Sequence, residues 1–141
     1  MTTVLPDLSA RINQADAATQ RRVALAVVEY GLSQVPVRVE GLDQALATLR
    51  TGQTGDETLR QSIQAAADAA DERYFAAQDA GDEAAESRLF KEARMLTAVA
   101  DALGIDPRAA AQQAAYEVQA TQDGDLSGIT SAIQTALVGD Q

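Results

Sequence analysis

The chain has 141 residues and a formal net charge of −10, and it contains no His, no Cys and no Trp. Without His and Cys it cannot use Ser-His-Asp or Cys-His nucleophile systems, disulfides, or the Glu-x-x-His pairs of di-iron bundles. The negative charge opposes binding to nucleic acid or to anionic lipid, because Lys and Arg drive both kinds of binding. Thirty residues are Ala, the best helix former, which predicts thin helices packed closely around a modest core.

The N-terminal part of the chain predicts a buried helix that follows a short segment. The segment lies around Asp7–Gln14, and Asp16 then predicts the N-cap of a helix that reaches about Gln34. The centre of that helix, Val23–Val28, is apolar on all sides, so we expect other helices to surround it. Pro36 ends the helix, because a Pro disfavours helical geometry in the residue before it.

Two further helices are predicted on either side of the clearest loop. A short helix runs from about Gly41 to Arg50, and the Gly- and Thr-rich segment Thr51–Gly55 is typical of a loop. Asp56 is expected to cap a long helix that ends at about Ala80. The predicted inward-facing stripe of that helix consists of Leu59, Ile63, Ala66, Ala70, Tyr74 and Ala77.

The next helix begins directly after the long one. Gly81 favours a helix end, and Asp82 begins a new helix whose first turn is acidic, which suits the helix dipole. Its apolar residues recur at intervals of four and three, a seam suited to antiparallel packing. That predicted seam consists of Leu89, Ala93, Leu96, Ala100 and Leu103.

The C-terminal part predicts two more helices. Asp106–Pro107 combines an N-cap with a Pro at the first helical position, and the helix that it starts runs to about Thr121. The segment Gln122–Asp125 is expected to be a loop. A last amphipathic helix covers Leu126–Val138, and its apolar face consists of Ile129, Ile133 and Leu137.

Together these patterns predict one all-α domain over residues 1–141, a helical bundle of about five to six helices with short loops. An acidic helical hairpin spans about 56–103, and a C-terminal helix at about 126–138 could be mobile. The longest apolar run, Val23–Val28, is far shorter than a membrane span, and the first residues lack the pattern of a signal peptide. We therefore expect a cytoplasmic protein.

The charge of the chain is distributed unevenly. Between Asp56 and Glu86 there are nine carboxylates and only two arginines, so this stretch carries −7 of the total −10. Residues 1–50 are neutral, with five acids and five bases. An acidic helical surface without His or Cys is more typical of a surface that attracts a basic partner than of an active site.

Tyr74 and Phe75 are an aromatic pair inside this acidic stretch. Adjacent helix positions point about 100° apart, so we expect Tyr74 in the core and Phe75 at an edge. An exposed Phe with an acidic rim has the anatomy of a protein-binding hot spot, whereas burial of both rings is the simpler alternative. The bases that follow, Arg88, Lys91 and Arg94, could pair with the acids and neutralise part of their negative charge. The predicted partner-binding residues are Asp68, Asp71, Glu72, Phe75, Asp79, Asp82 and Glu83.

Other kinds of site fit parts of the sequence less well. Carboxylates within residues 68–79 could bind a divalent cation, although solvated helix faces explain them more simply. Asp82–Glu86 resembles the first half of the acidic motif of all-helical nucleotide pyrophosphohydrolases, but Met95 stands where the second half needs an Asp. Asp123–Asp125 resembles part of a calcium loop without the later Glu, so a turn is expected. Arg21–Arg22 could grip a phosphate, but an exposed helical pair is the simpler interpretation.

Several segments between Leu42 and Thr121 share the features of one family. These segments are Leu42–Gly52, Glu57–Arg60, the Ala-rich pair Ala65–Ala80 and Ala84–Leu103, and Ala114–Ala120. In them the chain resembles the alanine-rich helical immunity proteins of bacterial polymorphic toxin systems. Members often carry a Trp before the Gly and a His in the later helices, and this chain has neither. The resemblance implies an inhibitor that covers a toxin domain by surface complementarity, with no catalysis and no cofactor.

Three functions follow from these patterns. The first is a non-catalytic binding protein of immunity or antitoxin type, whose acidic hairpin covers a basic protein surface such as that of a nuclease toxin. It would have no catalytic residue, metal or cofactor and no direct contact with nucleic acid or membrane. The second is a structural or adaptor bundle that acts as a homodimer, as the Ala-rich seams and the last amphipathic helix suggest. The third is a divalent-metal-dependent enzyme.

Overall fold

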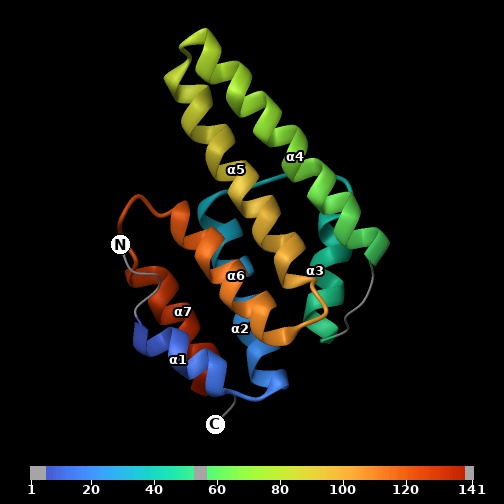
Figure 1. Ribbon diagram of the computed structural model, residues 1–141, viewed down its shortest axis with the longest axis vertical. Coiled ribbons are helices and arrows are strands. Elements are labelled where there is room, and N and C mark those ends of the chain that lie inside the picture. The colour runs from blue at the N-terminus through green and yellow to red at the C-terminus, as the bar shows by residue number, and fades with distance from the viewer. Residues whose placement is uncertain (1–5, 53–56, 139–141) are drawn as a thin grey trace.

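The computed structural model describes residues 6–52 and 57–138, which form seven α-helices and no β-strand (Figure 1). The helices are α1 (Pro6–Gln14), α2 (Ala17–Gln34), α3 (Leu42–Thr51), α4 (Glu57–Ala80), α5 (Glu83–Ala102), α6 (Pro107–Ala120) and α7 (Ser127–Val138). The predicted all-α single domain is confirmed, whereas the predicted number of five to six helices is too low. In this part of the chain, no helix combines the length and the apolar character needed to cross a membrane.

The additional helix is α1, where the sequence pattern predicts only a short segment. Leu8 and Ile12 are four residues apart and both are buried, and α1 packs against α6 and α7. The Nε2 atom of Gln112 on α6 donates a hydrogen bond to the carbonyl oxygen of Ser9 at 2.8 Å. A helix of this length is marginal by itself in water, so these tertiary contacts stabilise it.

Side-chain caps begin three of the helices at the predicted residues. Asp16, Asp82 and Asp106 each accept a hydrogen bond from a backbone N–H two or three residues later, at 2.8, 3.1 and 3.0 Å. These N–H groups have no partner inside their own helices, so each cap satisfies a donor that would otherwise need water. The predicted cap at Asp56 lies outside the described residues.

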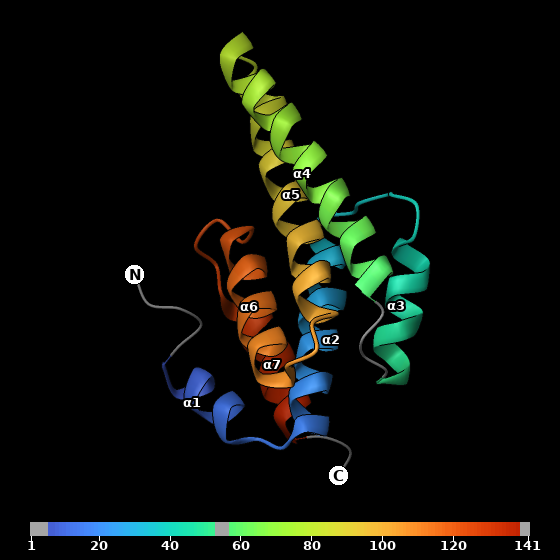
Figure 2. The same cartoon turned by 45° about the vertical axis from the view of Figure 1, so that its right-hand side comes forward.

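The central helix is α2, as its all-round apolar sequence predicts. It packs against α1, α3, α5, α6 and α7, and Val23 and Val27 are completely buried. Figure 2 shows α2 running through the body of the bundle between α3 on one side and α6 and α7 on the other. Gly31 permits the close approach of α5 and α6, because a Cβ atom there would lie 2.6 Å from Sδ of Met95 and 3.1 Å from Cγ1 of Val118.

The predicted apolar stripes agree with most of the core, whereas Ala66, Tyr74 and Leu137 are covered only in part. All five predicted seam residues, four on α5 and its C-cap Leu103, are buried, and so are four others, because α4 covers this helix on one side and α6 on another. On α4, Ala67 is fully buried, whereas the predicted Ala66 is covered only in part. These two neighbours lie on either side of the line that faces α5, so spacing alone does not choose between them. On α7, Ile129 and Ile133 are buried and Leu137 is partly buried.

Arg21 on α2 holds the C-terminal end of α5. Its Nη1 atom donates to the carbonyl oxygens of Gly104 at 2.7 Å and Ala102 at 3.3 Å, and its Nη2 atom donates to that of Ile105 at 2.8 Å. Carbonyl groups at a helix end have no helical partner, so the guanidinium satisfies them. The expectation of an exposed arginine pair is therefore right for Arg22 and wrong for Arg21, which is half-buried.

Candidate protein-binding surface

Helices α4 and α5 form a hairpin that projects beyond the rest of the bundle (Figures 1 and 2). The two helices pack along each other, while α5 also packs against α2 and α6 and α4 also packs against α3. Gly81 makes the turn between them with a φ angle of 73°, and Asp82 caps α5. Gly adopts this left-handed conformation readily because it lacks Cβ. The outer part of the hairpin thus presents its helix faces clear of the body.

One face of α4 carries most of the predicted binding residues. Asp68, Glu72, Phe75 and Asp79 follow at intervals of four, three and four residues, so they share a helix face. All four are exposed, and we call them the acidic stripe. The positions of α4 that are buried against α5, such as Ala70, lie about 180° around the helix axis. The acidic stripe therefore points away from α5.

The remaining three predicted residues lie beside the stripe or at the hairpin tip. Asp71 is half-buried, and its Oδ2 atom lies 3.6 Å from Nη2 of Arg94 on α5. Asp82 is the N-cap of α5, so one of its oxygens accepts the N–H of Ala85. Glu83 is exposed in the first turn of α5. The structure thus brings four of the seven predicted residues together on one face, with Asp71 at its edge.

An aromatic cluster supports the stripe from one side. Phe75 is 57% exposed and Tyr74 is half-buried, so Phe75 lies at an edge as predicted, whereas Tyr74 enters the core only in part. The ring of Tyr74 lies 5.2 Å from that of Phe75 and 5.9 Å from that of Phe90 on α5, between centroids. Phe90 is itself 38% exposed. Tyr74, Phe75 and Phe90, the aromatic cluster, therefore connect the two helices and leave apolar surface in solvent.

Arg94 links the hairpin to the body of the bundle. Besides Asp71 on α4, it binds Glu117 on α6, with 2.9 Å between Nη1 and Oε1. Its guanidinium carbon also lies 5.9 Å from the centroid of the Phe90 ring, within the range of a cation–π interaction. One side chain thus joins three helices and one member of the aromatic cluster.

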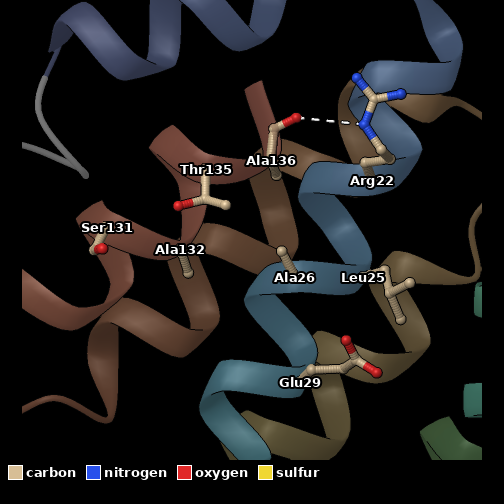
Figure 3. Close-up of a pocket in the computed structure, with 8 residues that line it drawn as sticks. All are labelled: Arg22, Leu25, Ala26, Glu29, Ser131, Ala132, Thr135 and Ala136. Carbon is tan, nitrogen blue, oxygen red and sulfur yellow. Dashed lines mark hydrogen bonds between the residues drawn. The ribbon is translucent and has the colours of Figure 1, made fainter. Parts of the chain in front are cut away.

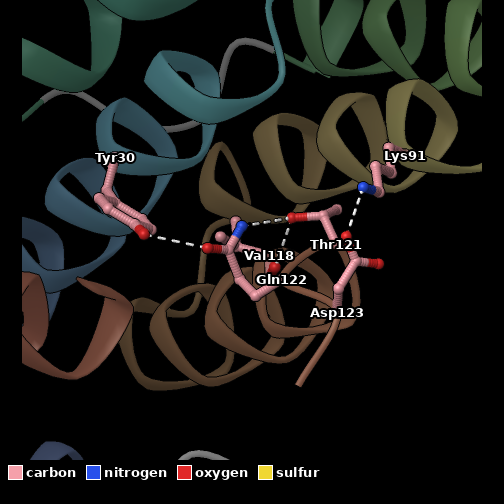
Figure 4. Close-up of polar contacts among 6 residues, drawn as sticks. All are labelled: Tyr30, Lys91, Val118, Thr121, Gln122 and Asp123. Atoms are coloured by element: carbon pink, nitrogen blue, oxygen red, sulfur yellow. Dashed lines mark hydrogen bonds and ion pairs between the residues drawn. The ribbon is translucent and has the colours of Figure 1, made fainter. Parts of the chain in front are cut away.

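The other two bases that could neutralise the acidic surface, Arg88 and Lys91, form their ion pairs elsewhere. Arg88 lies 3.6 Å from Glu92 on its own helix, and Lys91 pairs at 2.7 Å with Asp123 after α6 (Figure 4). Arg94 contacts Asp71 at the edge of the stripe. Within residues 57–138 and 6–52, no ion pair neutralises a carboxylate of the acidic stripe itself. Its negative charge is therefore available to a partner.

The turn that holds Asp123 is a structural element. Tyr30 on α2 donates a hydrogen bond to Oε1 of Gln122 at 3.0 Å, and Thr121 donates to the carbonyl oxygen of Val118 at 2.7 Å (Figure 4). The hydroxyl of Ser127 donates to Asp125 at 2.8 Å and the backbone N–H of Ser127 donates to it at 3.1 Å, and these two hydrogen bonds lower the pKa of Asp125. The predicted turn is thus confirmed, and its carboxylates cap α7 and pair with α5.

A half-buried carboxyl lies near the inner end of the hairpin. Burial raises the pKa of Asp101 on α5 to about 6, and the negative charge of Glu117 acts in the same direction. The positive charges of Arg60 and Arg94 oppose this shift. The junction of α4, α5 and α6 therefore contains a carboxyl that is costly to ionise, whereas the acidic stripe lies in solvent.

Sequence reasoning does not single out Phe90, and it gives Arg94 only as one of three candidate bases. The two residues are four positions apart, each directly after a buried seam residue, so they flank the seam of α5 on the same side. This spacing is a local signal for a shared face. Which flank meets the aromatic residues of α4 depends on how the two helices pair, and local spacing does not specify that.

In the described ranges, no three side chains of His, Cys, Asp or Glu lie where they could share a metal ion. Comparisons with protein-family models, with curated proteins and with solved structures find no match. The resemblance to helical immunity proteins therefore stays a prediction, and the geometry of the hairpin is the main support for a function.

Proposed function

We propose that this chain is a non-catalytic protein-binding domain that covers a basic partner surface with the acidic stripe of its projecting hairpin. The observation that carries the proposal is the exposed ring of Phe75, which lies on the stripe between Glu72 and Asp79. Tyr74 contacts this ring and limits its freedom, so less conformational entropy is lost when a partner covers it. A rigid aromatic anchor with a charged rim is typical of binding hot spots.

The carboxylates of the stripe have a different task from that of Phe75. They lie in solvent, so they contribute mainly to the rate and the specificity of association with a positively charged surface. Salt screens such exposed charges, so binding should weaken as ionic strength rises. The partner is expected to carry Arg and Lys around an apolar hollow that accepts the Phe75 ring.

An inhibitor of immunity or antitoxin type is the specific form that we propose. The support for it is the resemblance over Leu42–Thr121 together with the acidic surface. A nuclease toxin carries a basic surface because it binds the phosphate backbone of its substrate. Carboxylates on a projecting hairpin could occupy that surface and exclude the substrate without any chemical step.

The test of the charges compares two variants that change the net charge equally. E72K/D79K reverses two carboxylates of the stripe, and E40K/D43K reverses two exposed carboxylates at the start of α3. Each tagged variant and the wild type would capture proteins from a lysate of the source cells, with elution by a salt gradient and identification by mass spectrometry. We expect one basic protein on the wild type and on E40K/D43K, and none on E72K/D79K. Equal retention by all three proteins, or equal loss from both variants, would overturn the proposal.

The test of the anchor uses two exposed aromatic residues of similar exposure. Phe75 is 57% exposed and Tyr116 on α6 is 60% exposed, so neither truncation should perturb folding greatly. With the captured partner, F75A should lower the affinity about 30-fold or more, the effect of a hot-spot residue, while Y116A should change it little. Isothermal titration calorimetry measures both affinities. A larger loss for Y116A than for F75A would place the interface elsewhere.

A further inference from the structure

A surface groove lies between α2 and α7, on a part of the molecule that does not include the hairpin (Figure 3). It has a volume of about 450 Å³, and Ala26, Ala132 and Ala136 give it small apolar walls. Leu25 lines it as well and is only half-buried. The groove is therefore wide enough for apolar side chains, and Leu25 is an apolar side chain at its edge that is partly exposed.

The face around this groove is neutral in a strongly acidic protein. Helix α7 has no charged residue between Ser127 and Val138, and the exposed groove residues Ser131 and Thr135 carry only hydroxyl groups. The whole chain has a net charge of −10, so two copies repel each other over most approaches. The face formed by α2 and α7 avoids that repulsion.

The two charges on the α2 wall of the groove are opposite and lie at its two ends (Figure 3). Arg22 and Glu29 are seven residues apart, which corresponds to about 10 Å along the helix. Nε of Arg22 donates a hydrogen bond to the carbonyl oxygen of Ala136 at 3.4 Å, and its Nη2 donates to the hydroxyl oxygen of Thr19 at 2.9 Å. Both contacts of Arg50 with Glu29 involve Oε2. A second positive charge can therefore approach Oε1 of Glu29, and a second carboxylate can approach Nη1 of Arg22.

We propose that a second copy of this chain docks on the α2–α7 face in an antiparallel, two-fold arrangement. A two-fold axis near Leu25 and Ala26 places Arg22 of each copy opposite Glu29 of the other, because these charges are symmetric about that point. The exposed part of Leu25 then packs into the groove of the second copy. Such an interface uses the same patch on both subunits, as a two-fold dimer requires.

This dimer goes beyond the proposed function and does not depend on it. The hairpins carry the acidic stripes, and they belong to a different part of the fold from the α2–α7 face (Figure 1). A dimer would present two hairpins, so a partner with two binding sites would be held by both.

The experiment measures the mass of the full chain by light scattering, over a concentration range from micromolar to near-millimolar. The wild type should dimerise, whereas R22E alone and E29R alone should each be monomeric, since each places like charges opposite one another. An equimolar mixture of R22E and E29R should dimerise again, because both cross-subunit pairs are then of opposite sign. Far-ultraviolet circular dichroism shows whether each variant is folded.

A second pair of variants tests the groove if either charge variant fails to fold. S131E puts a charge into the groove and should abolish the dimer, while Q134E puts the same charge on an exposed position of α7 outside the groove lining. Q134E should dimerise like the wild type. A monomeric wild type across the whole range would overturn the proposal. So would dimers of R22E, E29R and S131E as stable as that of the wild type.

Discussion

Replacement of Asp101 by Asn should stabilise the protein at neutral pH and have little effect near pH 4. The pKa of this carboxyl is about 6 in the folded protein, above its ordinary value of 3.8, because burial and the charge of Glu117 disfavour ionisation. The folded state therefore binds the Asp101 proton more tightly than the unfolded state does. The contribution of this group to stability is most favourable below pH 3.8 and is lost as the pH rises toward 6. Asn keeps the shape of the side chain and removes the charge.

The size of the effect follows from the pKa shift and from the exposure of the group. A shift from 3.8 to about 6 corresponds to about 3 kcal/mol at about 1.36 kcal/mol per pKa unit. Asp101 is only half-buried, and solvent screens the charges around it, so we reduce the expected gain to about 1–1.5 kcal/mol. Unfolding entropy for a chain of this size is about 0.3 kcal/mol/K. The Tm of D101N should then exceed that of the wild type by about 3–5 °C near pH 7.5.

The assay is thermal and urea unfolding, followed by circular dichroism at several pH values between about 4 and 7.5. D68N is the matched control, because Asp68 is an exposed carboxyl in the middle of α4. Its effect should stay within about 0.5 kcal/mol at every pH. A gain for D101N that is the same at all pH values, or a loss at neutral pH, would refute the reasoning from burial.

Two further substitutions test contacts inside the bundle by urea unfolding. R21M should lower the free energy of unfolding by about 1–3 kcal/mol, since three carbonyl oxygens at and just after the end of α5 lose a charged donor. R22M should lower it by no more than about 0.5 kcal/mol, and equal costs would contradict the role of Arg21 at the end of α5. G31A should lower the free energy of unfolding by about 1–2 kcal/mol, because the new Cβ atom would lie 2.6 Å from Sδ of Met95. The better helix propensity of Ala offsets only part of this overpacking. In an M95A background the cost of G31A should fall below that in the wild type, because only the 3.1 Å contact with Cγ1 of Val118 remains. An unchanged cost there would show that Met95 is not the obstacle.

The helices of this protein could largely be predicted from local signals. Asp16 and Asp82 cap helices because a carboxylate reaches an N–H three residues later, and this interaction needs no other part of the chain. The uniformly apolar centre of α2 likewise indicated a surrounded helix. The 4-3 spacing on α4 placed Asp68, Glu72, Phe75 and Asp79 on one face, since helical geometry depends only on sequence separation.

Other features depended on which segments meet in space. The helix α1 is stable because it packs against α6 and α7 and buries Leu8 and Ile12. Short-range periodicity does not reveal this packing. Sequence spacing offered three bases near the acidic stretch, and only the pairing of α4, α5 and α6 brings Arg94 to Asp71.

Local spacing also does not predict the burial of Asp101 or the groove between α2 and α7, because both depend on how distant helices pack. By itself the sequence determined the helices and the residues that share each helix face, because backbone hydrogen bonds and caps act over a few residues. The tertiary structure alone decided which faces pack together, because that choice rests on shape and burial between residues far apart in the chain.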